Sequence, residues 1–459
     1  MKRTARITGD AMHKYIPNTE EQKKKMLEII GVSSVDELFS EIPADVKMNR
    51  PYRLDNAKSE IAVARHLTQL ANQNLGTNER VSFLGAGSYD HYIPSVVNHI
   101  ISRSEFYTSY TPYQPEVAQG TLQYIFEYQT MMTELTGLDV SNASMYDGAT
   151  ATAEAINMAT ATTRRHKVLV ASNLHPYTLD VIETYGYYRG YEIIRIKTKD
   201  GFVCREDLMN HLNDNVSCFV GGYPNFYGLI EDFTDISEKM HEKKALMILN
   251  ANPLSLGVLK TPGEMKVDIC VGEAQVFGIP QSFGGPYLGY LTCTEKLMRK
   301  MPGRVCGETK DVDGKRSFVL TLQAREQHIR REKANSNICS NQSLNVLMAT
   351  IYLSVMGKQG IVEVCHQNIQ KAHYAFREIT KLKHFESAFD GPFFNEFVVK
   401  TDLDVELIEQ KLKEAGIISG LDLSRLDPDL KGYILFCVTE KRTKEEIDKL
   451  VEVLGGIQL

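Results

Sequence analysis

A short turn rich in small residues, Met145–Thr150, could hold an anion. It reads Met-Tyr-Asp-Gly-Ala-Thr and opens the alanine-rich stretch Ala151–Thr163. The first N–H groups of a helix have no partner inside the helix, so such a turn can bind a phosphate through its backbone. A simpler interpretation is that Asp147 or Thr150 only caps the helix. The candidate phosphate-holding residues are Asp147, Gly148, Ala149 and Thr150.

A histidine, His175, follows the next β-branched run, in the segment Ser172–Pro176. An imidazole at the end of a strand could stack on the ring of an aromatic cofactor. The alternative is an ordinary polar histidine in a loop.

Two carboxamides stand where other residue types would carry pyridoxal phosphate chemistry. Asn250 ends the apolar run Ala245–Asn250, and Gln275 follows about two dozen residues later within Gly272–Pro280. An aspartate in the first place would keep the pyridine nitrogen protonated, and a lysine in the second would form a Schiff base.

These residues sit in a region that alternates short β-branched runs with helical stretches. Such alternation predicts a mostly parallel sheet with helices on both of its faces. The strand candidates are Lys167–Ala171, Glu192–Ile196, Cys218–Gly221, Leu246–Leu249, Ile269–Val271 and Leu288–Thr292.

The flanking regions differ in pattern from this central one. Two short helices are expected within Thr19–Phe39 and an amphipathic helix over Leu54–Asn74, before the glycine-rich segment Phe83–Tyr89. A long helix over Gln342–Met356 precedes a small α+β region, whose expected elements are strands Phe397–Lys400 and Tyr433–Val438 and helices Val405–Glu414 and Lys444–Leu454. We predict an N-terminal helical segment at 12–60, a large α/β domain at 61–357 and a small domain at 358–459. Residues 1–11 carry no pattern and are interpreted as an extension, a tag or an upstream start.

Composition narrows the function classes. The formal net charge of the 459 residues is −6 and we find no local basic patch for nucleic acid, so no nucleic acid partner is expected. The eight cysteines are scattered without a CxxC pair, which is typical of free thiols in a reducing compartment. No apolar run approaches the roughly 18 residues of a membrane span, and the N-terminus lacks the apolar core of a secretory signal. A cytoplasmic location without a membrane is expected. Motifs for P-loop nucleotides, dinucleotides and HExxH zinc sites are missing, as is metal-ligand spacing among the histidines.

Several motifs in one order make the sequence recognisable. They are Tyr110–Glu116, Tyr128–Met131 leading to Leu135–Gly137, Asn142–Ser144, Arg331–Ala334 and Ser336–Cys339. From about residue 12 to the end, the chain resembles the glycine decarboxylase P-protein of the glycine cleavage system. The resemblance implies fold type I of the pyridoxal phosphate enzymes, an aspartate aminotransferase-like α/β fold with a small C-terminal α+β domain. Asn335 and Ser340 depart from the usual threonines, and both stay small and polar.

That family exists as one long chain with two homologous halves or as two subunits, and this chain is similar to the first half. In the second half a His-Lys-Thr-Phe motif supplies the Schiff-base lysine, and superposition of the motifs puts Gln275 in its place. An amide nitrogen cannot form an imine, and neutral Asn250 cannot stabilise a pyridinium as a carboxylate does. A carboxylate at Asp147 would repel a phosphate. The resemblance therefore implies a vestigial pocket, with no cofactor bound covalently to this chain.

The implied function is that of a subunit which works with a partner bearing pyridoxal phosphate. Together they would decarboxylate glycine and pass the aminomethyl group to the lipoyl group of the H-protein. The loop 110–116, stiffened by two prolines, could contribute to a shared interface site, or its tyrosines could simply pack while Glu116 begins a helix at Pro115. The basic cluster Arg330, Arg331 and Lys333 could meet the acidic H-protein or a carboxylate, or be a solvated helix face. The candidate interface residues are Tyr110, Tyr113, Gln114 and Glu116.

Two other functions stay open on the sequence. One is an autonomous pyridoxal phosphate enzyme using Lys260 or Lys266, although Lys266 falls nine residues before the expected position. The other is a purely structural or regulatory subunit.

Overall fold

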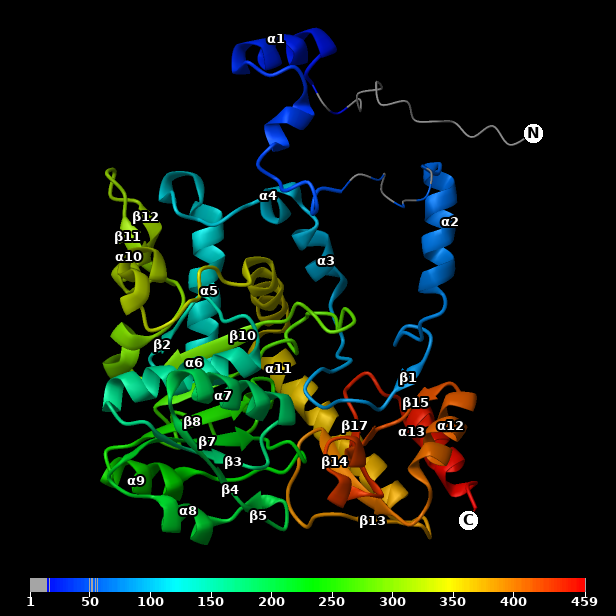
Figure 1. Ribbon diagram of the computed structural model, residues 1–459. Coiled ribbons are helices and arrows are strands. Elements are labelled where there is room, and N and C mark those ends of the chain that lie inside the picture. The colour runs from blue at the N-terminus through cyan, green and yellow to red at the C-terminus, as the bar shows by residue number, and fades with distance from the viewer. Residues whose placement is uncertain are drawn as a thin grey trace, which may run out of the picture. The chain divides into compact units, whose positions relative to one another are not determined.

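The computed structural model describes residues 15, 17–48, 50, 53, 55 and 57–458, so residues 1–11 and their interpretation lie outside it. The chain divides into two compact units, Met1–Asn74 and Leu75–Leu459 (Figure 1). Each unit is described by itself. The predicted domain boundaries stay predictions.

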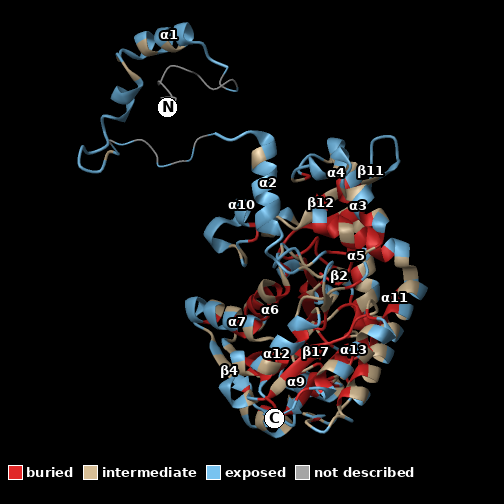
Figure 2. Cartoon of the chain, turned by 90° about the vertical axis from the view of Figure 1, so that its right-hand side faces the viewer, coloured by how far each residue is buried: buried red, intermediate tan, exposed pale blue. Residues whose placement is uncertain are grey.

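The described part of the first unit contains three short helices: α1 (Glu20–Ile30), the 3₁₀ helix η1 (Val35–Phe39) and α2 (Glu60–Ala71). The side chain of Thr19 caps α1 and Gly31 ends it with a φ of 85°. The helix expected over 54–74 is shorter, because Ser59 is extended and α2 begins after it. None of these helices has a buried residue, as their pale blue and tan colours show (Figure 2).

The centre of the second unit is a seven-stranded sheet in the order β2-β10-β9-β8-β7-β3-β4. Neighbours from β9 to β4 run parallel, while β10 is antiparallel to both β9 and β2. All six strand candidates are confirmed, with differences only at their ends. The strands are β2 (Val140–Ser141), β3 (Lys167–Ala171), β4 (Glu192–Ile196), β7 (Val216–Tyr223), β8 (Leu246–Ala251), β9 (Ile269–Glu273) and β10 (Gly289–Cys293).

The strands of the seven-stranded sheet form because their side chains can be buried on both faces of the sheet. All eight residues of β7 are buried, which is typical of a central strand covered on both sides. Helix α6 (Gly148–Thr163) packs on strands β7 to β10, and helix α5 (Gln119–Thr136) packs on helix α11 (Ser343–Ile379). The remaining α-helices of this part are α3 (Ser95–Ile101), α4 (Ser104–Tyr107), α7 (Pro176–Arg189), α8 (Arg205–His211), α9 (Thr234–Glu242) and α10 (Gln327–Arg330).

The C-terminal part has its own sheet, in the order β13-β14-β17-β16, and its own cluster of buried apolar residues. Helix α11 runs through the end of the predicted helix at Met356 but loses helical geometry at Gly357 (φ 59°, ψ −176°). The predicted helices and strands of this part are confirmed. They are β13 (Phe385–Ser387), β14 (Glu396–Thr401), α12 (Val405–Glu414), β16 (Leu421–Asp422), β17 (Tyr433–Cys437) and α13 (Lys444–Gly455).

Three short strand pairs complete the fold. Strand β1 (Val81–Ser82) pairs with β15 (Ile417–Ile418), which joins the start of the glycine-rich segment to the C-terminal part. The hairpins are β5 (Thr198–Lys199) with β6 (Phe202–Val203), and β11 (Val305–Lys310) with β12 (Arg316–Thr321). Within the described residues, no helix has the length and apolar character needed to cross a membrane.

Candidate functional site

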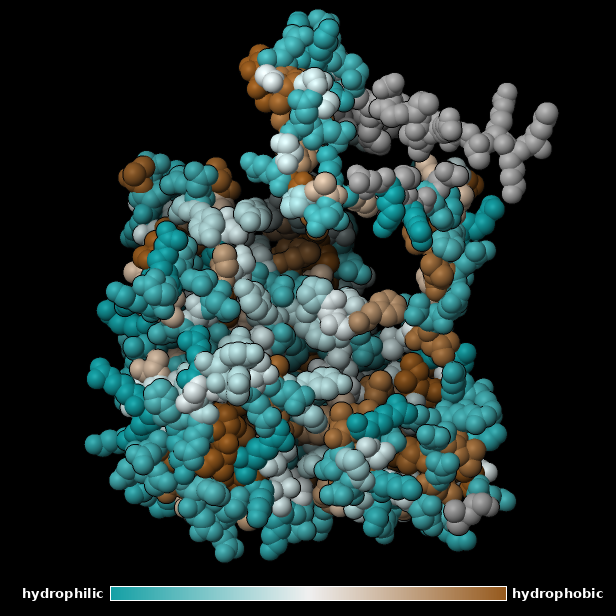
Figure 3. Space-filling model, in the orientation of Figure 1, coloured by the Kyte–Doolittle hydropathy of each residue, from teal (hydrophilic) through white to brown (hydrophobic). Residues whose placement is uncertain are grey.

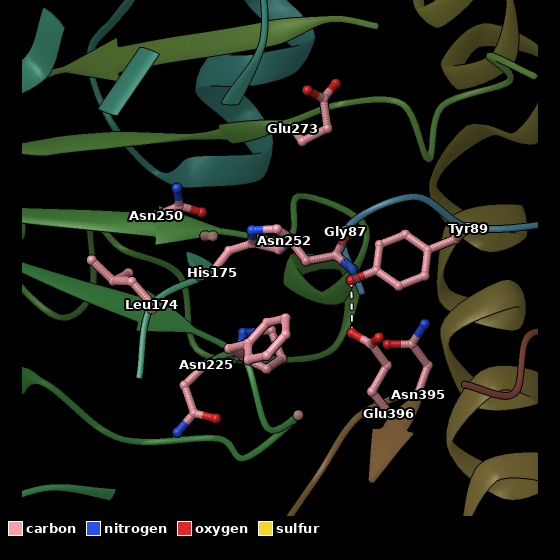
Figure 4. Close-up of a pocket in the computed structure, with 15 residues that line it drawn as sticks. Gly87, Tyr89, Leu174, His175, Asn225, Asn250, Asn252, Glu273, Asn395 and Glu396 are labelled. Atoms are coloured by element: carbon pink, nitrogen blue, oxygen red, sulfur yellow. Dashed lines mark hydrogen bonds between the residues drawn. The ribbon is translucent and has the colours of Figure 1, made fainter. Parts of the chain in front are cut away.

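A small cavity lies beyond the carboxyl ends of β7, β8 and β9, where ligands bind in open parallel sheets (Figure 4). Its volume is about 90 Å³, well below the roughly 300–1,000 Å³ of typical ligand pockets. Its lining includes Gly87, Tyr89, His175, Asn250, Glu273 and Glu396.

The turn at the start of α6 is filled by carboxylates. Asp147 accepts a hydrogen bond from the Thr150 backbone N–H at 2.8 Å and so caps the helix. The Gly148 N–H donates to Glu273 Oε2 at 3.0 Å. A Cβ at position 148 would lie 2.9 Å from the Glu273 backbone nitrogen, so glycine permits this close approach of β9. Two of the backbone donors that could hold a phosphate, those of Gly148 and Thr150, are therefore already engaged.

Glu273 is one of the residues that sequence reasoning missed. Its Oε1 also accepts from the Leu288 N–H at 2.8 Å and from the Gln275 N–H at 3.1 Å. Burial raises the pKa of this carboxyl to about 7, although its backbone donors lower it. The available signal was a charged residue at the end of a buried strand, at the edge of the sheet where ligands bind.

Gln275 is buried and uses both ends of its amide. Its Oε1 accepts from the Tyr89 N–H at 3.0 Å, while its Nε2 donates to the carbonyls of Tyr89 at 3.0 Å and Ile279 at 2.6 Å. The Gln275 amide therefore bonds both the N–H and the carbonyl of Tyr89, as the backbone of a neighbouring β-strand would. Gln275 therefore has a structural role in this chain.

His175 lines the cavity but fastens the same segment. Its Nδ1 accepts from the Tyr177 N–H at 3.2 Å, so its Nε2 carries the proton and donates to the Ala86 carbonyl at 3.0 Å. Burial lowers the pKa of His175, which keeps the ring neutral. The ring meets Phe226 edge to face at 5.1 Å, and its stacking on a cofactor ring stays a prediction.

Glu396, at the start of β14, makes the third attachment of the segment. It accepts from the Ala86 N–H at 2.6 Å and from the Tyr89 hydroxyl at 2.7 Å, the bond drawn in Figure 4. Burial raises the pKa of Glu396 to about 6 and that of Tyr89 well above its ordinary value. Neither residue was singled out from the sequence, because they lie more than three hundred positions apart in it.

These residues do not fit pyridoxal phosphate. Asn250 donates from Nδ2 to the Thr152 hydroxyl at 2.8 Å and carries no charge for a pyridinium. None of the described residues that line the cavity is a lysine. A phosphate at the start of α6 would meet the carboxylates of Asp147 and Glu273.

The two lysines of the alternative reading lie at the surface. Lys260 pairs with Asp232 at 3.1 Å and Lys266 with Glu238 at 2.8 Å. In the described part of the chain, no group of three or more His, Cys, Asp and Glu side chains could hold a metal ion.

The loop 110–116 lies apart from the cavity, since none of its residues lines it. Tyr110 is 88% exposed, and Gln114 and Glu116 are exposed too. Tyr113 accepts a hydrogen bond from Arg304 at 2.9 Å, and the guanidinium lies 4.9 Å from the centre of the tyrosine ring. Pro115 begins a 3₁₀ helix, η2 (Pro115–Val117), and no α-helix.

The model of the family described as glycine cleavage system P-protein matches residues 13–454 of this chain. The chain belongs to this family. It is 53% identical over 447 residues to a probable glycine dehydrogenase (decarboxylating) subunit 1 from Bacillus cytotoxicus, an alignment that covers 97% of this chain and all of the relative. A relative of the same description from Bacillus cereus is 52% identical over the same length and coverage.

Solved structures agree on the fold. A crystal structure of glycine decarboxylase (P-protein) of the glycine cleavage system, in inhibitor-bound form, matches with a TM-score of 0.88 and 39% identity, covering 96% of this chain and 99% of that one. A sphingosine-1-phosphate lyase from Burkholderia pseudomallei matches with a TM-score of 0.65 at 13% identity, covering 90% and 94% of the chains. The P-protein chain has the α/β fold of the fold type I pyridoxal phosphate enzymes, as the sequence predicted.

Proposed function

We propose that this chain is the first subunit of a two-subunit glycine dehydrogenase (decarboxylating), and that its own cofactor pocket is closed. The observation that carries the proposal is the engagement of two of the first backbone donors of α6, those of Gly148 and Thr150, by Glu273 and Asp147. Gln275, held by three hydrogen bonds, supports it, because the residue in the place of a Schiff-base lysine is committed to the backbone.

On this proposal pyridoxal phosphate belongs to a second subunit, and a lipoylated H-protein receives the aminomethyl group of glycine. The family and the names of the relatives support this assignment. The eight cysteines are free thiols, which supports a reducing cytoplasmic location.

The contribution of this chain is to complete the site of its partner from the exposed loop 110–116. Tyr110, Gln114 and Glu116 extend polar groups into solvent, and two prolines reduce the entropy lost when the loop is ordered at an interface. Tyr113 is held by buried Arg304, which fixes the middle of the loop.

The test is to locate the cofactor in the assembled complex. Both subunits are mixed with pyridoxal phosphate, reduced with borohydride and digested, and the modified lysine is found by mass spectrometry. We expect the adduct on the second subunit only. A stoichiometric adduct on any lysine of this chain would overturn the proposal. If the second subunit decarboxylated glycine at the full rate without this chain, the role of this chain would be structural or regulatory.

A further inference from the structure

A concave surface of unusual charge lies beside α10, away from the closed cavity. Its volume is about 320 Å³. We call it the basic pocket. It is lined by Arg299, Lys300, Leu322, Ala324, Arg325, Arg330, Lys333 and Asn335. Five of these eight residues are cationic and none is acidic, although the whole chain has 52 lysines and arginines against 58 aspartates and glutamates.

Most of the cations of the basic pocket have no carboxylate partner. Among the described residues, the side chains of Arg299, Lys300, Arg330 and Lys333 form neither an ion pair nor a hydrogen bond. Elsewhere on the surface such side chains pair readily, as Lys239 does with Glu242 at 2.9 Å and Lys449 with Glu452 at 2.9 Å. Like charges gathered without counter-charges repel one another, and an anion in the pocket would relieve that repulsion.

The wall of the basic pocket is built by several elements. Arg299 and Lys300 end the 3₁₀ helix η4 (Glu295–Lys300), and Arg330 ends α10. Arg325 donates to the carbonyls of Leu322, Met301 and Gly303, the last at 2.9 Å, so it ties the wall together. The surface over α10 is mostly hydrophilic (Figure 3).

The backbone at this wall is held in conformations that non-glycine residues rarely adopt. Leu322 has a φ of 53°, and Arg331, next to Arg330, has a φ of 56° with a ψ of −129°. Such residues concentrate at binding and active sites, where the surrounding contacts impose them.

We propose that the basic pocket is a binding site for a small, multiply charged anion of phosphate or polycarboxylate chemistry. Guanidinium groups bind such oxygens with paired, charge-assisted hydrogen bonds, and lysines add point charges. The concave shape and a volume near the lower end of small-ligand pockets favour a small molecule over the flat face of a protein. The proposal goes beyond the proposed activity and does not depend on it.

The experiment titrates the full chain with inorganic pyrophosphate and, separately, with citrate, by calorimetry at constant ionic strength. We expect saturable one-to-one binding by at least one of them, and the better ligand identifies phosphate or carboxylate chemistry. The double variant Arg330→Gln with Lys333→Gln should bind at least tenfold more weakly. The matched control, Lys239→Gln with Lys449→Gln, removes the same charge elsewhere and should bind like the unchanged chain.

Four results would overturn the proposal. The first three are saturable binding by neither probe, equal weakening in both double variants, and unchanged affinity in the Arg330→Gln, Lys333→Gln variant when its unfolding curve matches that of the unchanged chain. A polyglutamate peptide is the third arm. If it binds and neither small anion displaces it, the surface is a protein-docking face and the small-ligand proposal fails.

Discussion

Single side chains in and beside the cavity have structural roles at positions where a catalytic enzyme of this fold would carry chemistry. Gln275 satisfies two backbone groups of Tyr89, and Glu273 satisfies three backbone N–H groups. A buried backbone group without a partner is costly, so these side chains are hard to replace individually.

Gln275→Lys should therefore fail to restore a cofactor site. The lysine loses the three hydrogen bonds of the amide and meets a helix start already filled by carboxylates. We expect no borohydride-trapped pyridoxal phosphate adduct at position 275, and a free energy of unfolding lowered by about 2–4 kcal/mol. Urea denaturation and peptide mapping measure both. The exposed Gln410→Lys in α12 is the control, and an adduct at position 275 would contradict the prediction.

Glu273 makes the stability of the chain depend on pH. Its pKa rises from an ordinary 4.5 to about 7 in the folded state, mainly through burial. The folded state binds this proton more tightly, so the stability it provides is present below pH 4.5 and is lost as the pH rises through 7.

Glu273→Gln removes this dependence. Relative to the unchanged chain, the free energy of unfolding of the variant should rise between these two pH values by on the order of 3 kcal/mol. Any cost of the mismatched amide group is independent of pH and cancels in the comparison. Urea denaturation across the pH range measures the difference, and a difference that stays constant would refute the assignment.

At the scale of elements, the glycine-rich segment 83–89 is held by side chains from three separate parts of the chain. His175 comes from the start of α7, Gln275 from the loop after β9 and Glu396 from β14. The segment has little regular structure of its own, and its position depends on these contacts.

Glu396→Gln should loosen the segment. The glutamine oxygen can accept a hydrogen bond from the Ala86 N–H or from the Tyr89 hydroxyl. The glutamine NH₂ group then faces the other of these two donors, and that hydrogen bond is lost. We expect the Ala86 amide to exchange its hydrogen at least tenfold faster, a change of about 1.4 kcal/mol in local opening. Hydrogen exchange followed by mass spectrometry measures it. Glu386→Gln, which removes only a surface pair with Lys400, should leave this exchange unchanged.

The strands of the main sheet could be predicted because their signal is local. Buried parallel strands are continuous apolar runs, and β3 and β4 lie at the residues predicted for them. The helix expected from residue 54 was too long, because periodicity alone did not locate its start at Ser59. The roles of Glu396 and Arg304 were not predictable, since their partners are far away in the sequence.

At the scale of the whole molecule, the proposed contribution of the chain is a surface that its partner uses. The loop 110–116 is exposed in the chain by itself, and its role stays a prediction that only the two-subunit complex can test.

Glu116→Ala should lower the turnover of that complex without weakening its assembly. Glu116 forms no side-chain hydrogen bond or ion pair among the described residues, so its removal disturbs nothing else in the chain. Tyr113→Phe should also lower turnover, but it deprives buried Arg304 of a partner and needs a check of stability. Glycine–bicarbonate exchange and sedimentation measure the two properties. Unchanged exchange in Glu116→Ala would contradict the assignment, and Glu386→Ala is the surface control.

The sequence by itself determined the family, the mostly parallel sheet and the presence of amides at positions 250 and 275. These features depend on residue types and on short-range periodicity, which are visible along the chain. Only the tertiary structure showed which contacts these side chains make. Hydrogen bonds between distant segments decide that Glu273 occupies the start of α6 and that Gln275 holds Tyr89. Such pairings follow from how the strands and loops come together in space, which no local pattern specifies.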